Sequence, residues 1–155
     1  MVDVQTVSIA IASASVVVGV VYYALELRHQ NRIRQTDLVM KLYSQFDSLE
    51  FQKVYEEVLN REPMNYYDYE KKYGWAEATA VGMFFEGIGI LLHRKLVDIE
   101  LVDDMFTSHI KWTWEKYKDI TYEGRKLTNQ PEIYEWFEYL YNEMKKREQK
   151  LQSKP

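Results

Sequence analysis

The 155-residue sequence contains no cysteine, only three prolines and only six glycines. Without cysteine the chain has no disulfide, no thiolate metal site and no cysteine nucleophile. Scarce proline and glycine, together with 15% aromatic residues, exclude a disordered or linker-dominated chain. The length is typical of a single domain.

The sequence also lacks an excess of basic residues, because 20 Lys and Arg face 24 Asp and Glu and leave a net charge of −4. Nucleic-acid binding requires a concentrated basic face. Trp112 and Trp114 lie near Lys111 and Lys116, as in a surface that stacks on bases. Without a basic excess we interpret these tryptophans as core or interface residues and expect no nucleic-acid partner.

A charge-free segment of 22 residues, Val4 to Leu25, lies between Asp3 and Glu26. As a helix it would be ~33 Å long, enough to cross a hydrocarbon core of ~30 Å. A cleaved signal peptide would have a basic start and a shorter apolar core, whereas this chain starts Met-Val-Asp. A buried core helix is the other alternative. We expect a retained single transmembrane span.

The flanks of this segment predict its orientation. Arg28, Arg32 and Arg34 follow it, whereas Asp3 precedes it. Basic residues beside a span stay cytoplasmic, so we expect a single-pass protein of the cell (inner or plasma) membrane with its N-terminus outside and its bulk in the cytoplasm. The arginines would act as a stop signal, and they would also attract anionic lipid headgroups. The first partner is therefore the lipid bilayer.

One face of the predicted span carries only small or polar residues. Such a face lets two helix backbones approach closely, which predicts a helix–helix seam and either a homo-oligomer or a membrane-protein partner. The alternative is that small residues are simply common in weakly apolar spans. The seam residues are Gln5, Ser8, Ala12, Ser15 and Gly19.

The rest of the chain predicts helices throughout, because no segment alternates at period two for long enough to require a strand. We expect an all-α protein in which one N-terminal transmembrane helix precedes a compact four- to five-helix cytosolic bundle. The expected parts are a transmembrane anchor (1–27), a juxtamembrane helix continuing into the domain (28–47), the helical domain (48–148) and a frayed tail (149–155).

Helix boundaries follow from capping residues and breakers. Asp47 and Ser48, followed by Glu50, have the form of an N-cap that restarts a helix. Residues 61–70 are predicted to form a loop. The later expectations are a helix from about Asp68 or Trp75 to Leu96, an N-cap at Asp98 for a helix to about Tyr117, a loop at Gly124, and Pro131 as the first residue of the last helix.

Two segments carry a family resemblance: LVMKLYSQFDSLEFQKVYEEV and MFFEGIGILLHRKLVDIELVDDMF, with Phe84-Phe85-Glu86 and Leu96-Val97-Asp98 as the most specific parts. Together with the apolar span and an aromatic last helix, the chain resembles a prokaryotic family of small single-span membrane proteins with an uncharacterised helical domain. The resemblance implies an all-helical domain facing the cytosol and no established activity. It supplies no catalytic residue.

Glu86 is the main candidate for chemistry, because it lies within an apolar stretch. Gly82, Glu86, Gly89 and His93 share one helical face, and small residues there would allow close packing that buries the carboxylate. A functional interpretation is a general acid/base or a metal ligand. The interpretation that we favour is a structural carboxylate paired with a basic, His or Trp donor of a neighbouring helix.

An enzyme would require Glu86 to meet His93 or His109, which lies on the next helix. No His-Glu-x-x-His motif and no pair of histidines at helical ligand spacing is present. We therefore predict no metal and no cofactor and leave the question of an enzyme open.

A cluster of tyrosines completes the candidates, because Tyr66, Tyr67, Tyr69 and Tyr73 fall within eight residues. Tyrosines favour protein contacts, so we expect part of this cluster to form a partner surface. The function predicted from the sequence is a membrane-anchored helical interaction domain, such as an accessory or assembly subunit of a membrane complex. The alternative is a membrane-tethered enzyme or ligand sensor that uses Glu86, His93 and His109.

Overall fold

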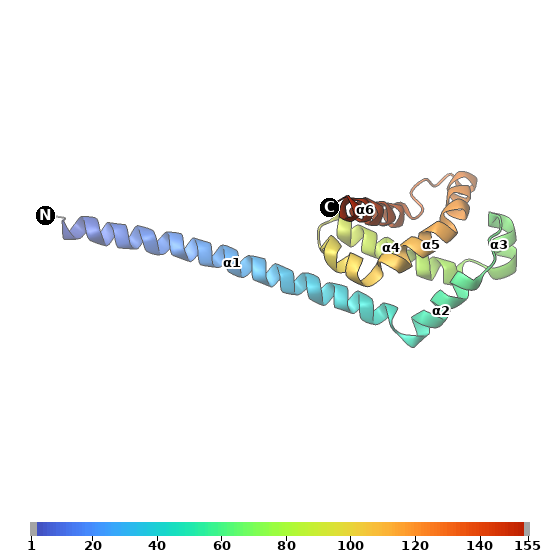
Figure 1. The fold of residues 1–155 in the computed structure, drawn as a ribbon, viewed down its shortest axis with the longest axis horizontal. Helices are drawn as coiled ribbons and strands as arrows, with labels where there is room; N and C mark the ends of the chain where they lie inside the picture. The colour runs from blue at the N-terminus through green and yellow to red at the C-terminus, as the bar shows by residue number, and fades with distance from the viewer. Residues whose placement is uncertain (1–2, 154–155) are drawn as a thin grey trace. The chain divides into compact units, whose positions relative to one another are not determined.

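The computed structural model describes residues 3–153, and within this range it contains helices and no strand, which confirms the predicted all-α class. The helices are α1 (Val4–Phe46), α2 (Leu49–Asn60), α3 (Tyr66–Tyr73), α4 (Ala76–His93), α5 (Ile99–Thr128) and α6 (Glu135–Gln152) (Figure 1).

The chain divides into two units, one ending at Asp37 and the other beginning at Leu38. The first unit is the N-terminal part of α1 and contains the charge-free segment. Two of its serine hydroxyls bond within the helix, since Ser8 donates to the Val4 carbonyl oxygen at 2.9 Å and Ser15 donates to that of Ile11 at 2.8 Å. A lone helix offers its apolar side chains nothing to pack against within the unit.

The second unit is a helical domain that begins with the last two turns of α1. Val39 and Phe46 bury their side chains there. As predicted, a cap separates this helix from the next one. Ser48, rather than Asp47, is the N-cap of α2, and its side chain accepts a hydrogen bond from the Phe51 amide at 3.2 Å.

The core of the domain lies between α4, α5 and α6, with α2 packed on α4 and α3 packed on α5 (Figure 1). The most extensive packing is that of α4 on α6. Phe85 of α4 stacks on Phe137 of α6 with ring centroids 4.9 Å apart, and Trp114 of α5 meets the same Phe137 ring edge-on at 5.1 Å. This packing holds the start of α6 against the middle of α4.

The loop predicted over 61–70 is only partly correct, because α3 occupies Tyr66–Tyr73. Asn65 caps it by accepting a hydrogen bond from the Asp68 amide at 3.0 Å. Gly74, at φ 70°, ends it before α4 begins. Of the two starts predicted for the third helix, Trp75 agrees with α4, whose N-cap it is, whereas Asp68 lies inside α3. The helix ends at His93, before the predicted Leu96.

Two predictions in the C-terminal third are also wrong. The helix capped by Asp98 does not end near Tyr117 but runs to Thr128, with Gly124 inside it rather than in a loop. Pro131 is not the first residue of the last helix, because it lies in a turn and α6 begins at Glu135. Tyr134, at φ 54°, interrupts the helical backbone at that point.

Candidate functional site

The face of α4 that carries Glu86 packs against the start of α6, in agreement with the close packing predicted from its small residues. A Cβ at Gly89 would overlap the carbonyl oxygen of Trp136, and a Cβ at Gly82 would lie 2.6 Å from the Tyr134 ring. Both glycines are therefore needed for the two elements to approach. His93 ends this face, with its ring 4.3 Å from that of Trp136.

Glu86 caps α6 from across this contact. Its Oε2 accepts a hydrogen bond from the Phe137 amide at 2.7 Å. The N-cap residue of α6, Tyr134, offers no side-chain cap of its own, so Glu86 takes over the task of satisfying a first-turn N–H. The predicted basic, His or Trp side-chain donor is wrong, since this donor is a backbone amide.

Two opposing effects act on the Glu86 carboxyl. Burial raises its pKa above the ordinary value, and the hydrogen bonds from the Phe137 and Trp136 amides lower it by a smaller amount. The helix N-terminus favours the negative charge, but the cost of removing the carboxylate from water is larger, so the pKa of Glu86 stays raised. The arrangement is suited to holding a helix end in place.

The structure does not gather Glu86, His93 and His109 into one site. Glu86 and His93 lie seven residues apart on α4, about 10 Å along its axis. His109, on α5, has its Nδ1 3.2 Å from the Tyr55 hydroxyl, and its ring packs on Phe46. Burial lowers the pKa of His109. Across residues 3–153 no three His, Asp or Glu side chains are grouped as for a metal ion.

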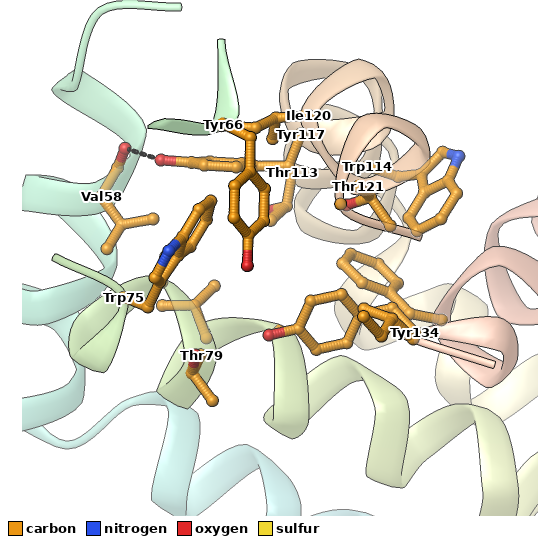
Figure 2. Close-up of a pocket in the computed structure, with 16 residues that line it drawn as sticks. Val58, Tyr66, Trp75, Thr79, Thr113, Trp114, Tyr117, Ile120, Thr121 and Tyr134 are labelled. Carbon is orange, nitrogen blue, oxygen red and sulfur yellow. Dashed lines mark hydrogen bonds between the residues drawn. The ribbon is translucent and has the colours of Figure 1, made fainter. Parts of the chain in front are cut away.

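A cavity of about 190 Å³ lies inside the domain, and neither Glu86 nor any histidine lines it. Figure 2 shows that the hydroxyls of Tyr66 and Tyr134 point into the same space, Tyr66 from above and Tyr134 from the right in this view. Trp75 lies beside Tyr66, with ring centroids 4.7 Å apart. The other lining residues are Val58, Ala78, Thr79, Val81, Gly82, Thr113, Trp114, Tyr117, Ile120, Thr121, Gly124, Ile133 and Phe137.

Two glycines make room for the tyrosine rings that line this cavity. A Cβ at Gly124, inside α5, would lie 2.9 Å from the Tyr66 ring, just as a Cβ at Gly82 would meet Tyr134. Glycine within a helix costs roughly 0.5–1 kcal/mol relative to alanine. At both positions the missing side chain makes room for an aromatic ring that forms the cavity wall.

The predicted tyrosine surface is mostly internal. Tyr69 is only 2% exposed and is not a surface residue. Tyr66 and Tyr73 are half-buried, and Tyr67 is the exposed member of the four. The cluster packs inward because α3, which was predicted as a loop, turns one side toward α5.

Sequence reasoning missed a buried arginine at the end of α2. Arg61 donates to Glu57 at 2.8 Å, to Glu77 at 3.2 Å and to the Tyr69 hydroxyl at 3.1 Å, and thereby ties α2, α3 and α4 together. Only its spacing of four from Glu57 is visible in the sequence. Tyr117 extends this network and donates to the Val58 carbonyl oxygen at 2.6 Å (Figure 2).

The residues predicted to meet the membrane lie on the exposed part of α1. They are the basic flank (Arg28, Arg32 and Arg34) and the seam residues (Gln5, Ser8, Ala12, Ser15 and Gly19).

These observations define an all-helical domain that follows a long apolar N-terminal helix. The chain belongs to the family of the domain of unknown function DUF4760, whose model matches residues 10–144. The resemblance to a family with an uncharacterised helical domain is thereby confirmed. No curated protein and no solved structure matches the chain.

Proposed function

We propose that this protein is a single-pass, membrane-anchored helical domain that binds other proteins at the cytoplasmic surface of the cell membrane. One observation carries the proposal: the charge-free segment Val4–Leu25 lies entirely within α1, and no residue is buried in the most apolar 18-residue stretch of that helix. A segment of this kind needs an apolar environment, and a bilayer provides one.

A second helix, α4, is also long and apolar enough to cross a membrane, but 44% of its 18 residues are buried inside the domain. It holds Glu86 against α6, so its apolar residues serve the core of the domain. This supports one span rather than two. With the arginine flank on the domain side, the positive-inside rule favours a cytoplasmic domain.

Binding to other proteins is supported by apolar side chains that the domain leaves on its surface. Trp112 is 64% exposed, and Leu49 and Met83 are 71% and 57% exposed. Exposed tryptophan is unusual outside contact surfaces. The enzyme alternative gains no such support, because Glu86 is engaged with α6 and the histidines lie elsewhere.

The anchoring and its orientation can be tested together, because the chain has no cysteine of its own. We expect the full-length protein to stay in the membrane pellet after alkaline carbonate extraction. In intact cells, a membrane-impermeant maleimide should label Asp3→Cys and should label Ser153→Cys only after lysis. A full-length chain in the soluble fraction would overturn the anchor, and the opposite labelling pattern would overturn the orientation.

A further inference from the structure

The side of α4 that is turned away from the core carries a line of apolar residues. Spacings of four, three, four and three place these residues one above another on the helix. Within α4 the only charged residue between Glu77 and His93 is Glu86, which is buried against α6. The first three residues of the line are exposed and the last two are half-buried. This line is the outer face of α4, and its residues are Ala76, Ala80, Met83, Gly87 and Ile90.

An apolar outer face is unusual for a helix at the surface of a domain. A surface helix normally turns charged and polar residues toward water, whereas a helix that is apolar all round is buried or spans a membrane. The opposite side of α4 already holds the core, through Phe85 and Ile88. The outer face is therefore suited to burial against a partner.

Large and small residues on the outer face fit a second copy of the same face. Met83 extends from the helix and is 57% exposed, whereas nothing lies within 4 Å of the Cβ position of Gly87. If two α4 helices cross antiparallel with a two-fold axis at the level of Phe85, Met83 of each copy lies opposite Gly87 of the other. In the same register Ala80 lies opposite Ile90. A two-fold contact requires such self-complementarity.

The charges at the two ends of α4 favour the antiparallel direction. Glu77 lies in its first turn, and exposed Arg94 and Lys95 follow its last residue. Glu77 accepts a hydrogen bond from Arg61, which also binds Glu57, so these three groups together carry one negative charge. An antiparallel crossing brings each acidic end beside a basic end. A parallel crossing would bring the two basic ends together, and like charges across a contact are unfavourable.

We propose that the outer face of α4 binds a second copy of this chain, with the two α4 helices crossing antiparallel. A single helix crossing is smaller than a standard protein interface. The proposal therefore rests on the proposed membrane anchoring in one respect, because confinement of both copies to one membrane raises their effective concentration. Trp112, on α5, lies outside this contact and stays available to other proteins.

Single cysteines can report the register of the crossing, because the chain has no cysteine of its own. Full-length Ala80→Cys and Ile90→Cys chains, each with a different tag, are reconstituted together in lipid vesicles and treated with a short bis-maleimide. We expect cross-linked dimers that carry both tags. Either variant alone should give roughly 5-fold less dimer, because two copies of the same position lie ten residues, ~15 Å, apart along the crossing.

A charge on the outer face should separate the two copies. Met83→Glu is expected to weaken association about 10-fold or more, because the contact would bury an unpaired carboxylate. Trp112→Glu is the matched control, since it places the same charge at a 64% exposed residue of α5, and should leave association unchanged. Energy transfer between labelled full-length chains in vesicles measures both, on a Gly19→Leu background that minimises contact through α1. Thermal unfolding followed by tryptophan fluorescence shows whether each variant is folded.

Three results would overturn the proposal. The first is a mixed sample that yields no more dimer than the single-cysteine samples. The second is a folded Met83→Glu chain that associates like the chain with Met83. The third is a fluorophore on Met83→Cys that spin-labelled lipid quenches, which would mean that lipid covers the outer face. Recovery of the chain in the soluble fraction would contradict the anchoring instead, and cross-linking of that soluble chain would still test the contact.

Discussion

At the scale of single residues, Glu86 shows how a carboxylate can be structural within an apolar helix. Its hydrogen bond to the Phe137 amide satisfies a group that α6 cannot satisfy with its own N-cap. Its ionised form nevertheless loses more through burial than it gains from the two amides, since the pKa of the carboxyl is raised. The residue therefore stabilises the junction of α4 and α6 through geometry more than through charge.

We predict that Glu86→Ala lowers the free energy of unfolding by about 1–3 kcal/mol, because the Phe137 amide is left buried without an acceptor. Glu86→Gln should cost less, since its amide oxygen can still accept. Thermal unfolding of the full chain in detergent, followed by tryptophan fluorescence, measures both changes. Unchanged stability in both variants would show that Glu86 does not hold α6.

The raised pKa of Glu86 also predicts a pH dependence. The folded state binds the Glu86 proton more tightly than the unfolded state, so this carboxyl stabilises the fold most at acidic pH. Its contribution declines as the pH rises from the ordinary value through the folded pKa. The stability difference between wild type and Glu86→Gln should accordingly shrink as the pH rises above 4.5, the ordinary value of a glutamate carboxyl. A difference that grows over this range would mean that the helix N-terminus outweighs burial.

At the scale of elements, the contact of α4 with α6 depends on where α4 carries glycine. Gly89 faces the Trp136 carbonyl oxygen, which belongs to the backbone and cannot move aside like a side chain. Gly87 lies two residues away on the same helix, with nothing within 4 Å of its Cβ position. The two glycines thus differ in tertiary surroundings while sharing the same secondary structure.

This difference predicts opposite effects of one substitution. Gly89→Ala should destabilise the domain by about 1–3 kcal/mol or more, because the added methyl group forces α4 and α6 apart. Gly87→Ala should stabilise it by about 0.5–1 kcal/mol through helix propensity alone. Denaturant unfolding of the two variants provides the comparison, and effects of the same sign would contradict the packing described for this face.

At the scale of the whole molecule, we propose that the small-residue face of α1 mediates association of the protein in a membrane. The Ser15 hydroxyl already bonds to the Ile11 carbonyl oxygen, so the face is compatible with lipid as well as with a second helix. What a partner helix would gain is close approach at Ser15 and Gly19, where bulk is missing.

We predict that Ser15→Leu and Gly19→Leu each weaken association of the full chain in membranes by about 1–2 kcal/mol. Val18→Leu, on another face of the same helix, should leave it unchanged. Energy transfer between labelled chains in vesicles, at varied protein-to-lipid ratio, reports the affinity. Equal effects of all three substitutions would exclude the seam.

The sequence alone determined the features that depend on neighbouring residues. The all-α class, the long first helix, the break in the helix near Asp47 and Ser48, and the cap at Asp98 follow from local hydrogen bonding and from hydrophobic periodicity. The small-residue face around Glu86 was also predictable, because helical spacing places Gly82 and Gly89 beside it. Each of these signals involves residues that lie within a few helical turns of one another in the sequence.

Only the tertiary structure decided which groups meet. The acceptor role of Glu86 toward a backbone amide 51 residues away, and the network of Arg61, depend on contacts that no spacing encodes. The cavity depends in the same way on Tyr66 and Tyr134, each resting on a glycine of another helix. Side-chain packing between distant segments determined which groups are in contact. The same packing keeps α5 helical through Gly124, where the sequence alone predicted a loop.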